Sequence, residues 1–378
     1  MSSLKENEKY DFLIVGSGLF GSVFAQQAKE KGFKCLIIDK RSHIGGNVYT
    51  EKVEEINVHK YGPHIFHTSD DEIWNYVNRF CKFNNYVNRP KVIFSDKLYS
   101  FPINLLTLYQ IFDVKTPEEA KKVLEESRVK IQNPKNLEEW ILSQVGEEIY
   151  RTFIYGYTKK QWGRSPKDLP SSIIRRIPIR LDFNDNYYSD KYQGIPIGGY
   201  TQMMENIQDG IEVLLDTDFF ENREYFEGIS RHIVFTGAID EFFNHCHGHL
   251  EYRSLRFETE TLDIEDYQGN ALINYTNEEV PWTRICEHKH FDLKKGGKTV
   301  ITKEYPESWS PGKEKFYPVN DERNNSVYSL YKKMTEGLYP RYIFGGRLAE
   351  YKYYDMHQVI GSSLSKFKKY LEWKSQQE

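Results

Sequence analysis

The chain has 378 residues, of which 39% are hydrophobic and 28% are charged, and its formal net charge is −4. This length allows two or three domains, and the composition is ordinary for a soluble globular protein. The slight negative charge argues against a general nucleic-acid-binding protein, which would carry an excess of basic residues.

The cysteines and the apolar runs bear on the cellular compartment. Cys35, Cys81, Cys246 and Cys286 are far apart and form no CxxC pair, which is typical of free thiols in a reducing environment. The apolar run FLIVGSGLFGSVFA is too short to cross a bilayer and is interrupted by glycines. We therefore expect a cytoplasmic protein without a membrane span.

The first 45 residues have the pattern of a βαβ unit. Residues 10–15 (YDFLIV) form a short apolar run, which predicts a buried parallel strand. Residues 20–31 can form a helix that ends at Gly32, and residues 34–38 are a second apolar run that stops before Asp39.

The turn between the first strand and the helix predicts a dinucleotide site. Its sequence is GSGLFG, in which Gly16 permits the turn, Gly18 lets the backbone approach a phosphate and Gly21 lets the helix pack on the strand. The start of the helix then offers free N–H groups to a pyrophosphate. Asp39 follows Gly21 by 18 residues, the spacing expected of a carboxylate that accepts from a ribose hydroxyl.

The middle of the chain changes from helical to extended patterns. Residues 103–128 are mostly helical, and NLEEWILSQVGEEIYRTFI predicts a helix that begins at Asn136 and ends at Gly156. Residues 250–303 are rich in β-formers with turn signals between them, which indicates an antiparallel sheet.

Two later segments predict a return to the first unit. Residues 231–240 (RHIVFTGAID) and residues 341–371, which begin RYIFGGR, both place a strand before glycine. The predicted fold is therefore α/β: a Rossmann-like domain with an inserted helical domain and an antiparallel β-sheet domain. We assign residues 1–80, 197–245 and 335–378 to the dinucleotide domain, 103–165 to the helical domain with a mobile loop at 161–181, and 82–102, 182–196 and 246–334 to the sheet domain.

A second glycine turn decides between the two common dinucleotides. The run KRSHIGGN follows Asp39 and contributes Lys40, Gly46 and Asn47, and FGGR precedes the C-terminal helical segment. This pair of turns resembles the FAD-binding pattern of the glutathione-reductase and amine-oxidase type, whereas a nicotinamide-only domain has no such pair. FAD is therefore the predicted cofactor.

Seven longer motifs resemble prokaryotic UDP-galactopyranose mutases, in that family's order and across nearly the whole chain. They are YGPHIFHT (61–68), GYTKKQWGR (156–164), IIRRIPIR (173–180), DNYYSDKYQGIPIGGYT (185–201), TRICEHKHF (283–291), YPVND (317–321) and GGRLAEYKYYDMHQ (345–358). Such matches are far more specific than a glycine fingerprint.

The resemblance implies an isomerase that uses reduced FAD, with NAD(P)H as the external reductant. Its substrate would be a UDP-sugar: UDP-galactopyranose and UDP-galactofuranose would interconvert, with the flavin N5 as nucleophile at the anomeric carbon. The UDP-N-acetylgalactosamine pair is an open alternative, and so is an FAD-dependent oxidoreductase of the amine-oxidase type. A non-catalytic nucleotide-sugar-binding protein is a third possibility. Family members are often homodimers, which we carry over as an expectation.

The resemblance also assigns site residues. Arg176 and Arg284 occupy the positions of the diphosphate-binding arginines, for which bidentate charged hydrogen bonds are suited, and His64 lies beside the flavin. The substrate-binding positions are Phe153, Tyr157 and Trp162 for the uracil and sugar, Tyr187, Tyr317 and Tyr353 for the phosphates, and Asn88 for the sugar. Arg347, Asp355 and Met356 match positions that contact FAD.

The run HCHGH (245–249) has donor atoms suited to zinc or copper. It lies outside every motif of the resemblance, and the mutase chemistry needs no metal. The sequence therefore predicts no metal site there.

Overall fold

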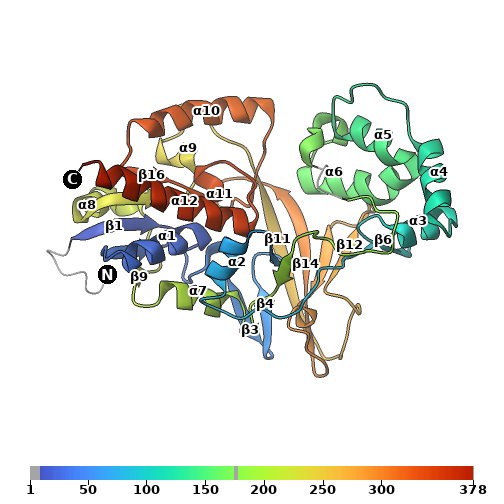
Figure 1. Cartoon of the computed structure of the whole chain (residues 1–378), viewed down its shortest axis with the longest axis horizontal. Helices are drawn as coiled ribbons and strands as arrows, with labels where there is room; N and C mark the ends of the chain where they lie inside the picture. The colour runs from blue at the N-terminus through green and yellow to red at the C-terminus, as the bar shows by residue number, and fades with distance from the viewer. Residues whose placement is uncertain (1–8, 174–177, 378) are drawn as a thin grey trace.

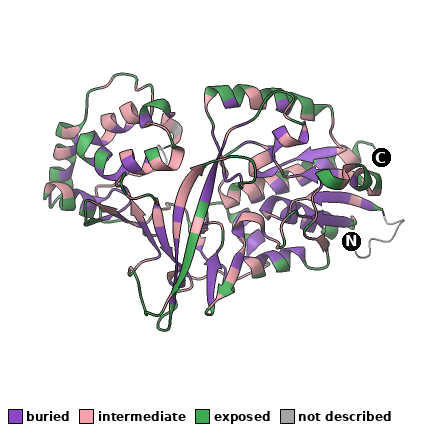
Figure 2. Ribbon diagram, turned by 180° about the vertical axis from the view of Figure 1, so that it is seen from behind, coloured by how far each residue is buried: buried purple, intermediate pink, exposed green. Residues whose placement is uncertain are grey.

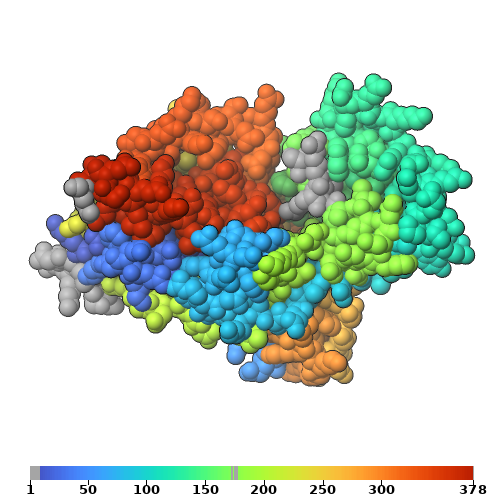
Figure 3. All heavy atoms as spheres, in the orientation of Figure 1, coloured from blue at the N-terminus to red at the C-terminus, as the bar shows by residue number. Residues whose placement is uncertain are grey.

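A computed structural model of the chain describes residues 9–173 and 178–377. Two sheets organise these residues, and helices cover one sheet and gather beyond the far end of the other (Figure 1). In the space-filling view, the helical region and the C-terminal part of the chain form separate masses (Figure 3). Among the described residues, no helix combines the length and apolarity needed to cross a membrane.

The first sheet is parallel and confirms the predicted Rossmann-like fold class. Its strand order is β16-β10-β1-β2-β9, so the first strand of the chain lies at the centre. The strands are β1 (Tyr10–Val15), β2 (Cys35–Ile38), β9 (Glu212–Leu214), β10 (Ser230–Phe235) and β16 (Tyr342–Phe344). The predicted first strand, residues 10–15, is confirmed at both ends. The predicted later strands, in segments 231–240 and 341–371, are β10 and β16 of the same sheet.

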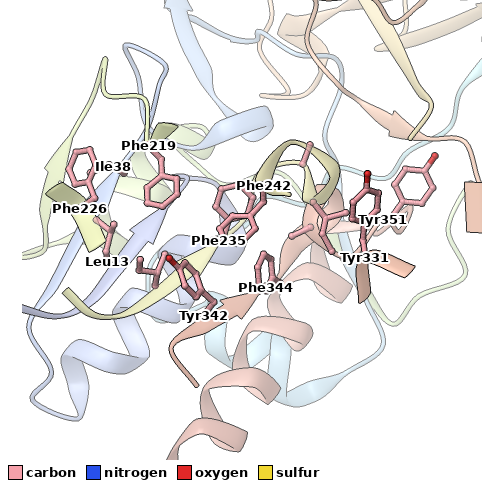
Figure 4. Packing of buried hydrophobic residues seen from close by; sticks show 14 of the residues in the cluster. Leu13, Ile38, Phe219, Phe226, Phe235, Phe242, Tyr331, Tyr342, Phe344 and Tyr351 are labelled. Atoms are coloured by element: carbon pink, nitrogen blue, oxygen red, sulfur yellow. The ribbon is translucent and has the colours of Figure 1, made fainter. Parts of the chain in front are cut away.

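Helices cover both faces of the parallel sheet because β1 alternates its side chains between two cores. Phe12 and Ile14 pack against α1 (Leu19–Glu30) and α12 (Met356–Ser375). Leu13 faces the opposite core, which is shown in Figure 4. The remaining helices of this part are α2 (Asp71–Val77), α7 (Tyr200–Gln208), α8 (Arg223–Ile229), α9 (Ile239–Phe242), α10 (Glu322–Glu336) and α11 (Gly346–Ala349).

The second sheet has seven strands in the order β15-β11-β14-β13-β12-β6-β7. Its neighbours are antiparallel except for β12 and β6, which run parallel. The strands are β6 (Lys91–Phe94), β7 (Lys97–Ser100), β11 (Tyr252–Leu262), β12 (Leu272–Tyr275), β13 (Arg284–Glu287), β14 (Thr299–Ser308) and β15 (Tyr317–Pro318). Figure 2 shows that the outer part of β11 is exposed.

Two short antiparallel pairs lie outside the two large sheets. β3 (Thr50–Val53) pairs with β4 (Ile56–His59), and β5 (Phe66–Thr68) pairs with β8 (Tyr192–Gly194). The described residues also contain five short 3-10 turns: Gly46–Val48, Pro166–Asp168, Ser171–Ile173, Phe220–Asn222 and His288–His290.

The helical region contains α3 (Leu105–Phe112), α4 (Pro117–Ser127), α5 (Leu137–Ile149), a π-helical turn (Tyr150–Tyr155) and α6 (Gly156–Trp162). The predicted stop at Gly156 is wrong. Gly156 has helical φ and ψ of −68° and −37°, and the helix ends at Gly163, where φ is 65°. The predicted helix is instead interrupted at Gly146, whose φ of 78° and ψ of −179° are not helical. A Cβ at Gly156 would lie 2.0 Å from the carbonyl oxygen of Thr276, so glycine here permits close packing on the sheet rather than a stop.

The predicted domain boundaries differ from the packing in one place. The segment 246–334 contains α10, yet Tyr331 of α10 is fully buried in the core of the parallel sheet. The division of the chain into three domains otherwise stays a prediction.

Two buried histidines lie where the β3–β4 pair meets the second sheet. His59 and His288 are 2% and 0% exposed, and the Nδ1 atom of His288 accepts from the backbone N–H of His59. Burial, together with His288 and His64, lowers the pKa of His59 well below its usual range. Burial likewise lowers the pKa of His288 to about 3, although Glu287 opposes the shift.

These shifts predict a loss of stability in mild acid. Between about pH 6.5 and 5.5 the unfolded chain protonates both histidines, whereas the folded chain keeps them neutral. The free energy of unfolding should therefore fall as pH falls, by about 2 kcal/mol per pH unit from this pair. Urea unfolding over this range measures the slope. His288→Gln should reduce it, and the exposed His247→Gln should not; equal slopes in all three proteins would contradict the assignment.

Candidate functional site

The two glycine turns of the dinucleotide pattern meet in space. A Cβ added at Gly46 would lie 3.0 Å from the Cα of Gly18, so side chains are excluded between the turns. The backbone N–H of Gly45 also donates to the carbonyl oxygen of Ser17 at 3.1 Å. The first turn of α1 has no side-chain cap, which leaves its N–H groups for an anion. This arrangement suits a bound pyrophosphate.

The first and third glycines of GSGLFG are fixed by sterics. Gly16 has a φ of +110°, and a Cβ there would lie 2.0 Å from Thr236 Oγ1. A Cβ at Gly21 would lie 2.1 Å from the carbonyl oxygen of Gly16. Each glycine therefore allows an approach that a larger residue would block.

Asp39 supports the turn directly. Its Oδ2 accepts from the backbone N–H and the hydroxyl of Ser17, at 2.8 and 2.7 Å, and its Oδ1 accepts from the N–H of Arg41 at 3.0 Å. The sequence predicts a bond from a ribose hydroxyl to this carboxylate. Since a carboxylate has about four acceptor positions, Oδ1 retains room for that bond.

A cavity of about 480 Å³ opens beside the glycine turns, a volume within the range of small-molecule sites. Most predicted site residues line it: Asn47, His64, Asn88, Phe153, Tyr157, Trp162, Tyr187, Arg284, Tyr317, Arg347, Tyr353, Asp355 and Met356. The second sheet, the helical region, strand β5 and helices α11 and α12 thus contribute to one cavity. Gly16, Gly18, Gly21, Asp39, Lys40 and Gly46 do not line it, and Arg176 lies outside the described residues.

Arg284 stands at the centre of the cavity wall. It lies opposite Glu304 in the β13–β14 ladder, and its guanidinium donates to the hydroxyl of Tyr157. Its Nε is 3.7 Å from Glu304 Oε1, and neither of these buried atoms has a hydrogen-bond partner among the described residues. The guanidinium therefore has capacity left for an anion.

Charge keeps this guanidinium protonated. Burial disfavours its charged form, but Glu304 and the hydroxyls of Tyr157 and Tyr317 raise the pKa of Arg284 well above its usual value. Burial raises the pKa of Glu304, which is 3% exposed, and Arg284 lowers it in part. Glu304 was not predicted from the sequence. A Cβ at Gly62 would lie 3.3 Å from its Oε2, so the YGPHIFHT motif also packs against it.

Tyr317 and Tyr353 stack beside Arg284. Their ring centroids are 5.1 Å apart at an interplanar angle of 22°. The guanidinium of Arg347 lies over both rings, 5.8 Å and 5.2 Å from the two centroids, and donates to the carbonyl oxygens of Phe316 and Tyr354 at 3.2 and 2.5 Å. The two phenols and two guanidinium groups make this side of the cavity suited to phosphate.

A second group of cavity residues is aromatic. Phe153 is 3% exposed, and its ring centroid lies 6.0 Å from that of Phe101, with an interplanar angle of 13°. The ring centroids of Tyr187 and Phe101 are 6.2 Å apart, and the backbone N–H of Tyr187 donates to the carbonyl oxygen of Asn88 at 2.8 Å. Phe153 is thus both a core residue and a cavity residue. Flat rings of this kind can stack on a base or cover a sugar face.

His64 is neutral near physiological pH. Its Nδ1 lies 2.8 Å from the carbonyl oxygen of Gly62, so Nδ1 carries the proton and Nε2 has a free lone pair. Burial, reinforced by Arg347 and opposed by the bond to Gly62, lowers the pKa of His64 to about 4. Its neighbour in the motif, His67, also lines the cavity and is held by Asp190 Oδ2 at 2.8 Å. This pair was missed, although His67 lies in YGPHIFHT.

The helix α6, which carries Tyr157 and Trp162, is anchored at two points. The ammonium of Lys160 donates to the carbonyl oxygens of Tyr275, Val280 and Trp282 at 2.8–2.9 Å. Arg253, which is 5% exposed, donates to the carbonyl oxygen of Gln161 at 2.9 Å. Gln161 and Trp162, which the sequence places at the start of a mobile loop, therefore belong to an anchored helix.

Comparison with known proteins first gives the class. Residues 14–80 match the family described as "NAD(P)-binding Rossmann-like domain". A solved structure entitled "Crystal structure of reduced UDP-Galactopyranose mutase" superposes with a TM-score of 0.74 at 14% identity, covering 96% of this chain and 94% of that one. An oxidoreductase from Methanosarcina mazei superposes at 0.53 and 13% identity, over 86% and 82%. The chain thus contains a domain of the Rossmann-like class.

The family follows from the more similar sequences. Residues 152–353 match the family described as "UDP-galactopyranose mutase". An Escherichia coli protein named "dTDP-fucopyranose mutase" is 39% identical over 93% of this chain and 96% of its own length. A Klebsiella pneumoniae protein named "Probable UDP-galactopyranose mutase" is also 39% identical, over 97% and 96%. The chain belongs to the UDP-galactopyranose mutase family, and it is an isomerase.

The anchor of α6 gives a prediction with a matched control in the same helix. Lys160→Met leaves three carbonyl oxygens without a charged donor and should lower the free energy of unfolding by about 3 kcal/mol. Lys159→Met removes an exposed ion pair with Glu278 and a contact of the ammonium with the Tyr155 ring, each worth about 0–1 kcal/mol. Urea unfolding of the two variants tests the difference. Equal losses would show that the cage around Lys160 does not stabilise the helix.

Proposed function

We propose that the protein interconverts UDP-galactopyranose and UDP-galactofuranose with the help of reduced FAD. The observation that carries the proposal is the position of Arg284: its guanidinium lies in a cavity wall, with unused hydrogen-bonding capacity, between two phenols and an aromatic surface. A nucleotide sugar has a diphosphate for the cation and flat or apolar faces for the rings. Membership of the mutase family supports the same substrate class.

The residues around the glycine turns fit FAD. Gly18, Gly46 and the free N–H groups of α1 would hold the pyrophosphate, and Asp39 would accept from the ribose. A second group of residues would contact the part of FAD that enters the cavity. These residues, which all line the cavity, are Asn47, Arg347, Asp355 and Met356. Bound reduced FAD would supply a nucleophile, its N5, for the anomeric carbon of the sugar. NAD(P)H would serve only to reduce the cofactor.

The cationic side of the cavity would bind and orient the diphosphate. As the bond between the anomeric carbon and the diphosphate breaks, negative charge grows on the leaving oxygen. Arg284 can stabilise that charge through its free N–H groups, and Tyr317 and Tyr353 can donate from their hydroxyls. Glu304 stabilises Arg284 through charge rather than through a hydrogen bond, because Arg284 Nε and Glu304 Oε1 are 3.7 Å apart. Arg176 shares the diphosphate role by the resemblance alone.

His64 would act as a hydrogen-bond acceptor at the cofactor side. Its pKa of about 4 keeps the ring neutral above pH 5, and Nδ1 donates to Gly62. Nε2 can therefore accept a hydrogen bond from the cofactor or the sugar while the ring stays neutral. A protonated His64 would lose this acceptor.

The remaining contacts would select the sugar and the base. Phe153, Tyr157 and Trp162 would cover the uracil and sugar, and Asn88 and Tyr187 lie on the same side of the cavity. The dTDP-fucopyranose mutase relative has the same 39% identity as the Klebsiella pneumoniae relative. dTDP-fucopyranose is therefore a second candidate substrate, beside the UDP-N-acetylgalactosamine pair.

Direct assay of the reaction tests the proposal. The flavin-loaded protein, reduced by dithionite, should convert UDP-galactofuranose to UDP-galactopyranose without consuming O₂ or NAD(P)H in proportion to product. Chromatography of parallel reactions with dTDP-fucopyranose and UDP-N-acetylgalactosamine ranks the three sugars. Consumption of one reductant or oxidant per turnover would instead favour the amine-oxidase-type oxidoreductase. Binding without any change of ring size would favour a binding protein.

The role of Arg284 gives a separate prediction. Arg284→Lys keeps the charge but loses the forked donor geometry, so kcat/KM should fall about ten- to a hundredfold. Arg256→Lys is the matched control, because Arg256 lies on the exposed part of β11 and pairs with Glu258 and Glu307 at the surface. Flavin content, read from absorbance, should be unchanged in both variants. A full rate in Arg284→Lys would remove this guanidinium from the diphosphate site.

A further inference from the structure

The folded chain brings a buried carboxylate to the HCHGH run. Asp240, in the first turn of α9, is 1% exposed, and His245 and His249 follow in the loop that leads to β11. One potential ligand atom from each of the three residues lies within 4.8 Å of the others. The sequence predicts no metal at HCHGH, because the run lies outside the mutase motifs, but Asp240 adds a third potential ligand only in the folded chain.

The spacing of Asp240 and His245 fits shared coordination better than a hydrogen bond. Asp240 Oδ2 and His245 Nδ1 are 3.3 Å apart, yet Nδ1 is buried and makes no hydrogen bond among the described residues. Two ligand atoms bound at 2.0–2.1 Å to one tetrahedral Zn²⁺ lie about 3.3 Å apart. An ion at this position would give the buried nitrogen a partner.

The carboxylate is also oriented as metal ligands usually are. The backbone N–H of Leu250 donates to Asp240 Oδ2 at 3.1 Å, and the hydroxyl of Tyr252 donates to Oδ1 at 3.2 Å. Such outer hydrogen bonds fix the direction of a coordinating side chain. The loop itself is held by Tyr331, whose hydroxyl donates to the carbonyl oxygen of Gly248 at 2.7 Å and accepts from the N–H of His247 at 3.0 Å.

The third ligand can complete the site with little movement. The rings of His245 and His249 lie side by side, with centroids 4.0 Å apart, and His249 is exposed, so its side chain is free to turn. A second group with metal-ligating atoms, Asp266, Glu287 and His290, differs because its imidazole already has partners: His290 Nε2 lies 3.4 Å from a carboxylate oxygen of Asp266 and of Glu287. Its buried carboxylate, Glu287, already accepts from the N–H groups of Tyr267 and Gln268 and from the hydroxyl of Thr299.

We propose that Asp240, His245 and His249 bind one Zn²⁺ or a similar divalent transition-metal ion, with water as the fourth ligand. Two imidazoles and one carboxylate are a ligand set that such ions accept. The ion would join α9, at the edge of the parallel sheet, to the start of β11 in the second sheet. None of the three residues lines the cavity, so the site is structural and independent of the proposed function.

Metal titration of the full-length, flavin-loaded protein tests the site. After dialysis against a chelator, isothermal titration with ZnCl₂ should show one ion bound per chain, and saturating Zn²⁺ should raise the Tm. The affinity should fall at least about tenfold in His249→Gln and in His245→Gln. Three variants should leave it unchanged: His247→Gln, which changes the other histidine of the run, Cys246→Ser, which removes the nearby thiol, and His290→Gln, which disables the second group.

Each outcome has a definite meaning. If the wild-type protein shows no saturable Zn²⁺ binding, or if His249→Gln and His247→Gln bind equally, Asp240 and His245 are an ordinary ion pair and the proposal is wrong. Turnover should not change after removal of the metal. Loss of turnover with unchanged flavin content would overturn the structural role. Failure of the mutase assay alone would leave the titration result standing.

Discussion

The cavity depends on one cross-strand pair, Arg284 and Glu304. A guanidinium placed alone inside a protein would be costly, because its charge loses the solvation of water. Glu304 compensates for that loss from the neighbouring strand, but at 3.7 Å it does so through charge and leaves the N–H groups of Arg284 available. Under the proposed function, an anionic substrate would meet a cation that is already in place, which would reduce the reorganisation needed during the reaction.

The same pair shows how the cavity depends on the strand pairing of the second sheet. The β13–β14 ladder sets the register of Arg284 and Glu304, and β14 continues into the pairing with β11. β11 in turn pairs with β15, where Arg253 lies opposite Tyr317. Arg253 also caps α6 through the carbonyl oxygen of Gln161. A displacement of β11 would therefore reach Tyr317 and Tyr157 together, although the two residues are far apart in the sequence.

The sequence predicts those parts of the fold that depend on local patterns. The GSGLFG turn and the apolar runs beside it place β1, α1 and β2 correctly, because sterics of glycine and burial of a parallel strand act over a few residues. Gly156 shows the limit of such reasoning. Its glycine is required by the carbonyl oxygen of Thr276, which lies in another element, and a stop signal cannot be distinguished from close packing without that contact.

The residues of the cavity divide in the same way. The resemblance to the mutase motifs identifies Arg284, Tyr317, Tyr353 and Tyr157, which all line the cavity. It misses Glu304, because a single acidic residue in a strand has no sequence signal. Its role arises only from the strand register. Asp240 is a parallel case, since its carboxylate meets His245 through the loop geometry and not through a motif.

Anchoring of α6 gives part of the cavity wall a fixed position. Lys160 and Arg253 fix the helix to the second sheet, so Tyr157 and Trp162 have fixed positions before any ligand arrives. Ile173 and Pro178 also line the cavity, but they come from the chain that follows the helix. Under the proposed function, this rigid aromatic wall would select the base and sugar by shape, while Arg284 on β13 would supply charge for the diphosphate. Recognition of the rings and stabilisation of the leaving group would then depend on different elements of the fold.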